Sequence, residues 1–389
     1  MSGAGLAPST PFVVDADAHI LEPPGLWEEY LEPKYRERAI KIVTVDGLER
    51  LVVDNEIVMP FGLAGLGGAE LDARDLFTNP TLTYLDGAPP ASMDPAARLT
   101  LFDDWQVDAG VIFPTIGILW DKEDDPELAI AYARAYNRWQ WDFSSSHLDR
   151  FAPIAHVPLY DPELALAELR RCLDLGFKGV FVAPEPVGGK RPSHADFDPL
   201  WSLLQEAGLP FCLHVIVRFN RSVNAFGQWF DRAKGESNSV FTFGMGGTFQ
   251  LIPAISALVC DGLFERFPRL KACVVECGGG WPGYVMDRLD EKFARFGSDS
   301  LKMPPSEYFK RNVWTVFDPT ERSIDATLDL LGEEQLCWGS DWPHIDSHVD
   351  AAKEIRASVA GLSERRRRLV LGENARRLFQ IPARAAQRS

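Results

Sequence analysis

Eight short apolar runs recur along the chain, and each ends at a polar residue or a turn. The runs cover residues 12–19, 109–115, 151–158, 177–183, 210–216, 271–277, 313–317 and 335–341. Apolar runs of this length, bounded by turn residues, are typical of strands buried in a parallel sheet. The pattern therefore predicts eight buried strands.

Helix-like segments lie between most of these runs. Residues 161–175 place Leu164, Leu169 and Leu173 near one face, and Gly176 follows as a stop signal. Residues 126–143 and 363–379 have a similar pattern. Strands that alternate with helices indicate a parallel sheet joined by crossovers, and eight such units predict an α/β fold, the closed (β/α)8 TIM barrel, formed by residues 1–389 as a single domain.

Two insertions interrupt this rhythm. The first, 35–100, begins with a predicted β-hairpin over 39–53 whose turn is Asp46-Gly47, followed by an irregular Gly- and Pro-rich stretch from 60 to 95. The second, 217–250, follows the fifth run and is polar, aromatic and Gly-rich. Because loops at the C-terminal ends of barrel strands form the rim of the active site, we interpret 217–250 as a lid.

The first run carries three ionisable residues on one face. Side chains alternate across a strand, so Asp15, Asp17 and His19 point the same way. Inside a barrel these groups would be costly to desolvate unless they are paired or bind a metal. We therefore predict a metal site there. Glu22, three residues further on, is either an additional ligand or a cap of the segment that follows.

Other strand ends supply further candidate ligands. His214 ends the fifth run, Glu276 ends the sixth before the glycines 278 to 280, and Asp341 ends the eighth. We expect all three at the metal centre, with Glu276 or Asp341 as a catalytic base. His344, three residues after Asp341, is either a ligand or a partner of one. Among the remaining histidines, His156 in the third run is able to reach the site, while His147, His194 and His348 are expected at the surface.

Composition excludes several classes of function. The net charge of −16 argues against a nucleic-acid partner, because phosphate binding needs clustered Lys and Arg. The six cysteines show no C-x-x-C pair and are expected to be reduced and structural. With no signal-like N-terminus and no apolar run near about 20 residues, we expect a soluble, cytoplasmic protein without a membrane partner. The sequence leaves open whether it forms a homo-oligomer.

Several motifs together resemble the amidohydrolase superfamily. They are Asp15-x-Asp17-x-His19, His214, Glu276-x-Gly-Gly-Gly-Trp281 and Gly339-Ser-Asp341-Trp-Pro-His344. The segments 103–114, 264–271 and 372–379 look like the branch that contains aminocarboxymuconate-semialdehyde decarboxylase and related aromatic-acid decarboxylases. This resemblance runs over nearly the whole chain and implies a metal-dependent barrel enzyme.

The chain also departs from that branch. The resemblance implies His-x-His on the first strand, where this chain has Asp17, and a catalytic His on the sixth, where it has Glu276. The metal-bridging lysine of many binuclear relatives is absent, since the fourth run ends Val182-Ala183-Pro184. Oxygen-rich mixed ligand sets favour iron or manganese over zinc. We therefore predict two divalent metals, with iron preferred, and keep one zinc or manganese ion as the alternative.

A carboxylate-rich, two-metal variant of this barrel is similar to the non-heme diiron monooxygenase of platensimycin and platencin biosynthesis. That resemblance implies O2-dependent hydroxylation of a bulky, diterpenoid-like substrate carried as a coenzyme A thioester. Arg218 and Arg221 are the candidate contacts for such a cofactor, and the predicted lid carries suitable aromatic residues: Phe219, Phe226, Trp229, Phe230, Phe241 and Phe243. The alternative is a metal-dependent decarboxylase or hydrolase acting on a carboxylic acid.

Overall fold

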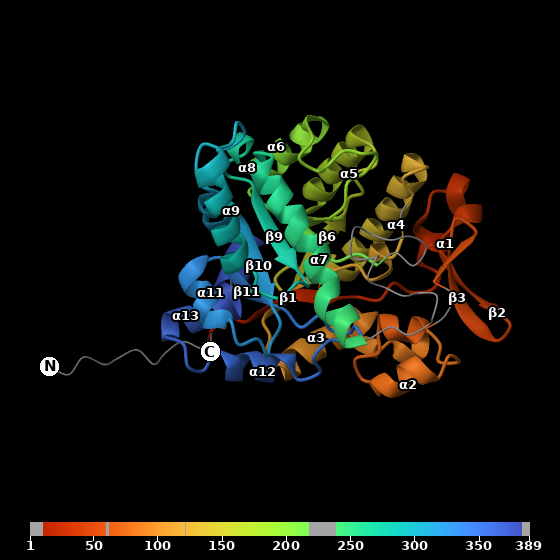
Figure 1. Cartoon of the computed structure of the whole chain (residues 1–389). Coiled ribbons are helices and arrows are strands. Elements are labelled where there is room, and N and C mark those ends of the chain that lie inside the picture. The colour runs from red at the N-terminus through yellow and green to blue at the C-terminus, as the bar shows by residue number, and fades with distance from the viewer. Residues whose placement is uncertain (1–10, 60–61, 121, 218–238, 383–389) are drawn as a thin grey trace.

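An eight-stranded parallel barrel forms the centre of the molecule (Figure 1). The computed structural model describes residues 11–59, 62–120, 122–217 and 239–382. The strands follow one another around the sheet in chain order. They are β1 (Val14–His19), β5 (Ala109–Phe113), β6 (Phe151–His156), β7 (Gly179–Val182), β8 (Pro210–His214), β9 (Lys271–Val275), β10 (Val313–Phe317) and β11 (Leu336–Trp338). Each lies within one of the eight predicted runs, so the predicted TIM barrel is confirmed.

The barrel closes between β11 and β1. The amide of Asp341 donates to the carbonyl oxygen of Asp17 over 2.8 Å. The amide of His19 donates to the carbonyl oxygen of Trp342 over 2.9 Å. Gly339 makes this approach possible, because a Cβ atom there would lie 2.2 Å from the Cβ of Asp17. The first and last strands, far apart in the sequence, thus bring their polar ends together.

Helices on the outside of the barrel begin and end where the sequence predicts. In α4 (Pro126–Ser144) and α5 (Pro162–Leu175), a preceding aspartate caps the first turn and proline takes the first position. Gly176 ends α5 in the left-handed conformation. The predicted helix over 363–379 is also present, as α13 (Glu364–Arg368), a π-helical turn (Leu369–Glu373) and α14 (Asn374–Leu378).

The remaining helices complete the crossovers and the insertion. They are α1 (Leu26–Tyr30), α2 (Ala73–Thr78), α3 (Pro95–Asp104), α6 (Asp198–Ala207), α7 (Ser239–Cys260), α8 (Leu263–Arg266), α9 (Pro282–Phe296), α10 (Pro305–Asn312), α11 (Ile324–Leu330) and α12 (Ala351–Ser358). Apart from α2, which is largely exposed, these helices contribute buried apolar residues to one continuous core with the strands.

The insertion after β1 forms a small antiparallel sheet. The predicted hairpin is confirmed as β2 (Lys41–Val45) and β3 (Leu48–Val53), and Asp46 and Gly47 adopt the positive φ angles that such a turn requires. A third strand, β4 (Glu56–Met59), was not predicted, although Asp54-Asn55 makes a second turn with positive φ angles. The stretch predicted as irregular also contains α2.

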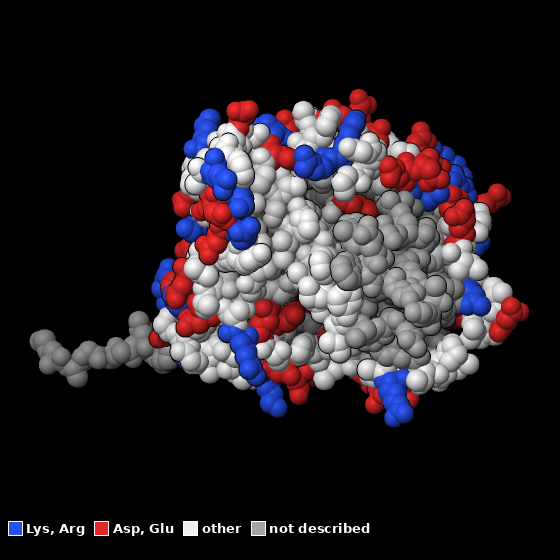
Figure 2. All heavy atoms as spheres, viewed as in Figure 1, with Lys and Arg blue, Asp and Glu red and all other residues white. Residues whose placement is uncertain are grey.

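The predicted lid differs from the structure at its C-terminal end. Residues 239–250 are the first part of α7, an unbroken helix, rather than loop. The segment Phe243–Cys260 is long and apolar enough to cross a membrane, with a mean hydropathy of 1.5, which contradicts the expectation that no apolar run approaches that length. A third of this segment is buried against the protein, and α7 runs across the front of the strands, where it forms an uncharged band (Figures 1 and 2). Arg218, Arg221 and four lid aromatics (Phe219, Phe226, Trp229 and Phe230) lie outside the described residues.

Candidate metal centre

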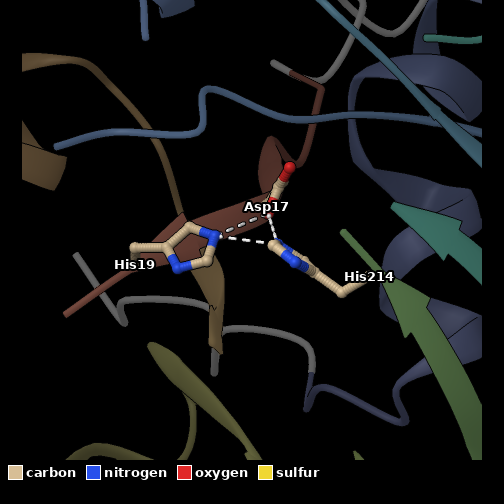
Figure 3. Close-up of side chains that lie close together, drawn as sticks. All are labelled: Asp17, His19 and His214. Carbon is tan, nitrogen blue, oxygen red and sulfur yellow. Dashed lines mark hydrogen bonds and ion pairs between the residues drawn. The ribbon is translucent and has the colours of Figure 1, made fainter. Parts of the chain in front are cut away.

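Three predicted ligands converge at the C-terminal ends of β1 and β8 (Figure 3). His19 Nε2 lies 3.1 Å from His214 Nε2 and 3.2 Å from Asp17 Oδ1. Asp17 Oδ1 is also 3.6 Å from His214 Nε2. All three side chains are buried. Strands separated by about half of the chain therefore present two imidazoles and a carboxylate to one point.

The hydrogen bonds of the two imidazoles define their protonation. His19 Nδ1 lies 2.9 Å from the carbonyl oxygen of Pro114, and His214 Nδ1 lies 2.9 Å from that of Val215. A carbonyl oxygen only accepts, so each Nδ1 carries a hydrogen, and in the neutral form of each ring the lone pair of Nε2 faces the other ring. Burial and the neighbouring His344 lower the pKa of His19 to about 3, which keeps this ring neutral.

When both rings are neutral, two nitrogen lone pairs and a carboxylate oxygen face one another without a proton between them. No hydrogen-bond donor among the described residues reaches Asp17 Oδ1. Such an arrangement is unfavourable unless a cation lies at its centre, and carbonyl acceptors behind metal-binding imidazoles are the usual way of fixing this tautomer. The donor set of two neutral imidazoles and one carboxylate fits a divalent transition metal.

Asp341 and His344 lie next to this group. Asp341 Oδ1 is 3.5 Å from His19 Nε2 and 2.7 Å from His344 Nδ1. The other ring nitrogen of His344 lies 3.0 Å from the hydroxyl of Thr115. His344 forms a second potential ligand group with His19 and Asp341, and the same contacts allow it to orient Asp341, so the geometry fits both roles considered for this residue.

Glu276 approaches the group from β9. Its Oε2 lies 3.3 Å from His214 Nε2 and has no hydrogen-bond partner among the described residues. Burial, together with the charge of Asp341, raises the pKa of Glu276 well above its usual range. Glu276 and Asp341 have positive φ angles of 58° and 57°, a conformation that costs a residue with a side chain about 1–3 kcal/mol and is concentrated at functional sites.

Asp346 extends the cluster of carboxylates. Glu276, Asp341 and Asp346 each offer an oxygen within 4.8 Å of the others. Asp346 is not among the residues predicted from the sequence, although it lies only two residues after His344 in the same loop. No Lys or Arg of the described residues forms an ion pair with Asp15, Asp17, Glu276 or Asp341.

Asp15 lies beneath the cluster rather than in it. Its carboxylate accepts from the amide of Ser340 over 2.9 Å and from the Ser340 hydroxyl over 2.6 Å. Burial raises the pKa of Asp15 to about 7, against these hydrogen bonds. Asp15 therefore ties β1 to the loop that carries Asp341, and the structure does not bring it into any of the potential ligand groups.

Glu22 caps the segment after β5. Its carboxylate accepts from the amides of Ile116 over 2.8 Å, Thr115 over 3.1 Å and Gly117 over 3.3 Å. Burial raises the pKa of Glu22 to about 7. Of the two roles considered for this residue, the cap is the one that the geometry fits, since Glu22 belongs to none of the potential ligand groups.

Helix α7 holds the ends of β8 and β9 in place. The Gln250 side chain accepts from the amide of Ile216 over 3.0 Å and donates to its carbonyl oxygen over 2.9 Å, two residues beyond His214. Gly247 packs against Glu276, and a Cβ atom there would lie 2.1 Å from the Glu276 carbonyl oxygen. The residues predicted as lid therefore contribute, through α7, to the position of both strand ends.

Comparison with known proteins agrees with this geometry. The model of a family described as amidohydrolase matches residues 14–381, nearly the whole chain. The chain belongs to the amidohydrolase family. With the donor set at its strand ends, it is a metal-dependent enzyme of this family.

Similar proteins include aromatic-acid decarboxylases. A gamma-resorcylate decarboxylase from Rhizobium is 28% identical over 276 residues, which cover 66% of this chain and 78% of that protein. An amidohydrolase from Mycobacterium avium subsp. paratuberculosis has the same fold, with a TM-score of 0.75 and 22% identity over 96% of this chain and all of the other. A dihydroxybenzoic acid decarboxylase from Polaromonas, solved with bound manganese and the inhibitor 2-nitroresorcinol, has a TM-score of 0.65 and 18% identity, over 96% of this chain and 98% of that one.

Proposed function

We propose that this protein is a divalent-metal-dependent decarboxylase that removes the carboxyl group of a small aromatic acid without oxidising it. The observation that carries the proposal is the meeting of the Nε2 lone pairs of His19 and His214 with the carboxylate of Asp17. The decarboxylases among the similar proteins support the choice of reaction. This reverses the order of the two hypotheses drawn from the sequence.

His19, His214 and Asp17 would hold one cation, with Asp341 as the fourth protein ligand. Manganese or zinc suits two imidazoles and two carboxylates, and manganese is the ion in the solved Polaromonas enzyme. A divalent cation bound there would polarise the oxygens of the substrate. The contacts of Nδ1 with the carbonyl oxygens of Pro114 and Val215 leave Nε2 of each imidazole as the atom that would bind it.

Glu276 is the candidate proton donor. In decarboxylation the bond between ring carbon and carboxyl carbon breaks, CO2 leaves, and the electron pair stays on the ring carbon until a proton replaces the lost group. Glu276 Oε2 lies 3.3 Å from His214 Nε2 and has no hydrogen-bond partner among the described residues, so the protonated carboxyl group of Glu276 would supply that proton. The Thr115–His344–Asp341 chain keeps the neighbouring carboxylate in a fixed orientation.

Anaerobic turnover tests this proposal. The protein, loaded with Mn2+ or Zn2+, is incubated with a panel of hydroxylated benzoates under nitrogen and under air, and the CO2 released and the arene formed are measured. We expect equal amounts of both products with and without O2. The Glu276→Gln variant should keep its metal and lose activity by roughly 10²–10⁴-fold. Turnover that requires O2, or consumes it, would overturn the proposal.

The O2-dependent monooxygenase remains the competing hypothesis. The observation in its favour is the carboxylate group Glu276, Asp341 and Asp346, which is able to hold a second cation. The similar proteins described above are decarboxylases or amidohydrolases, which favours the non-oxidative reaction. Elemental analysis separates the two: a diiron enzyme contains two irons per chain and loses one in the Asp346→Asn variant, whereas the decarboxylase contains one metal in both proteins.

A further inference from the structure

Arg98 in α3 is a buried cation next to the end of β1, and it is not among the residues predicted from the sequence. Its side chain is 1% exposed, and among the described residues it forms no ion pair. Burial lowers the pKa of Arg98 to about 9, against the charge of Asp15, so the guanidinium is charged at neutral pH. A charge without an ion-pair partner is costly to bury, so other contacts must hold Arg98 in this place.

One of these contacts is a hydrogen bond that the barrel itself cannot supply. Where the barrel closes, the amide of His19 donates to the carbonyl oxygen of Trp342 over 2.9 Å. The next residue of that loop, Pro343, has no N–H, so it cannot donate to the carbonyl oxygen of His19 in return. Arg98 Nη2 donates to this oxygen instead. A side chain from the insertion therefore fixes the main chain of a predicted metal ligand.

The same guanidinium packs against the loop that carries Asp341. Its Cζ atom lies 4.4 Å from the centroid of the Trp342 ring and 5.6 Å from that of the Phe102 ring. An aromatic ring attracts a cation that lies over its face, and the attraction is stronger where water is excluded. Trp342 is buried and directly follows Asp341, whose positive φ of 57° persists only if the surroundings impose it. Arg98 thus contacts both sides of the junction between β1 and β11.

The insertion holds the guanidinium from its other edge. Arg98 Nε donates to the carbonyl oxygen of Ala91 over 2.7 Å. The carbonyl oxygen of the next residue, Ser92, accepts from the amide of Leu21 over 2.9 Å, just beyond the end of β1. These bonds fix Arg98 between the insertion and the strand that carries Asp17 and His19.

We propose that Arg98 is a positioning residue of the metal centre, which sets the separation of His19 and Asp341 by bonding to the main chain of the first and packing on the loop of the second. The proposal rests on the metal site of the proposed function, and it holds for any reaction catalysed there. The role belongs to the planar shape of the guanidinium rather than to its charge, since Nη2, Nε and the face of the group serve three different contacts.

Arg98→Lys separates shape from charge. Lysine keeps the positive charge but donates from a single atom, so it cannot replace all three contacts. Titration with Co2+ measures the affinity of the site, and the visible absorption of bound Co2+ reports the arrangement of its ligands. We expect Arg98→Lys to bind Co2+ about tenfold more weakly than the wild-type protein, with a changed spectrum. Arg98→Met, which removes every donor, should bind it up to about 100-fold more weakly.

Arg150→Met is the matched control. Arg150 Nε donates to the carbonyl oxygen of Asp108 over 2.7 Å, just before β5 begins and therefore at the opposite end of the barrel from the metal centre. Its loss should lower the stability to urea and leave the affinity for Co2+ and the spectrum unchanged. Arg98→Met replaces a buried charge by an apolar side chain, which is often neutral for stability, so a folded variant is available if Arg98→Lys does not fold.

The positioning role is refuted if either folded Arg98 variant binds Co2+ with the affinity and spectrum of the wild-type protein. It is also refuted if Arg150→Met changes both to the same extent, or if the wild-type protein binds no Co2+. Weaker binding and a changed spectrum in the Arg98 variants of a protein that decarboxylates nothing would support the positioning role and reject the proposed reaction.

Discussion

The two sides of the barrel mouth are built on opposite principles. On the side of β1, β8, β9 and β11, carboxylates and imidazoles meet with their lone pairs facing one another. On the side of β5, β6 and β7, the ring of Trp120 packs against those of Tyr132 and His156, at centroid distances of 5.4 and 5.1 Å. The first side needs a cation to offset the facing lone pairs, whereas the second is held by aromatic packing.

Backbone strain follows the same division. Glu276 and Asp341 both have left-handed backbone conformations. Trp120 and His156, on the aromatic side, do not. Strain of this kind persists only where the surroundings impose it. Here Gly247 of α7 packs against Glu276, and the amide of Asp341 is bound to β1. Under the proposed function, the strained acidic side is therefore the part of the barrel mouth that would hold the metal and perform the chemistry.

The largest expected effect comes from Asp341→Asn. This change removes a carboxylate shared by two potential ligand groups and keeps the size of the side chain. We expect the bound metal to fall well below one per chain and the activity to fall by at least about 100-fold. Metal content by mass spectrometry and kcat/KM measure the two effects. Asp350→Asn, an exposed carboxylate at the start of α12, is the control, and equal behaviour of the two variants would contradict the assignment.

Removal of the metal should lower the melting temperature of the protein through the acidic side alone. A ligand present at a hundredfold excess over its dissociation constant stabilises the folded state by about 2.7 kcal/mol, so added Mn2+ should raise the melting temperature by several degrees. Scanning calorimetry before and after chelation measures this shift. Asp17→Asn should lose the shift, while Trp120→Phe should keep all of it. A shift that depends equally on both residues would show that the two sides are not independent.

Gly247→Ala tests whether α7 sets the position of Glu276. The new methyl group would lie 2.1 Å from the Glu276 carbonyl oxygen, and overpacking of this kind costs about 1–3 kcal/mol. We expect lower stability to urea and a lower kcat. Gly244→Ala in the same helix has open space around the added atom and should be neutral or stabilising by up to about 1 kcal/mol. If both variants behave alike, the contact with Glu276 has no influence on the site.

The sequence predicts the barrel well because its strands are buried on both faces and appear as apolar runs. The same reasoning misses β4, which has only four residues and is partly exposed. It also misses the start of α7, where Gly244, Gly246 and Gly247 have low helix propensity and packing against the barrel decides the conformation.

The candidate site shows a similar limit. Alternation along β1 predicts Asp15, Asp17 and His19 on one face, and the structure brings Asp17 and His19 together with His214 but leaves Asp15 bonded to Ser340. It did not distinguish a carboxylate that meets imidazole lone pairs from one that meets backbone amides, as Glu22 does. That distinction depends on loops from other parts of the chain, which the pattern of a single strand does not contain.

The smallest effect is expected from Ser340→Ala, which weakens the support beneath the acidic side. The Ser340 hydroxyl donates to Asp15 over 2.6 Å and accepts from the amide of Trp342 over 3.0 Å, while the amide of Ser340 keeps its own bond to Asp15. Loss of the hydroxyl should cost about 1–3 kcal/mol in the free energy of unfolding, measured in urea, because both partners are buried. Metal affinity should fall by up to about 100-fold, as for other residues that orient a ligand without binding the metal. The control is Ser358→Ala. Ser358 is the last residue of α12, and its hydroxyl donates to the carbonyl oxygen of Pro319, so its loss should leave metal affinity unchanged. If Ser340→Ala binds metal as the wild-type protein does, Asp15 contributes to folding alone and the acidic side is oriented without it.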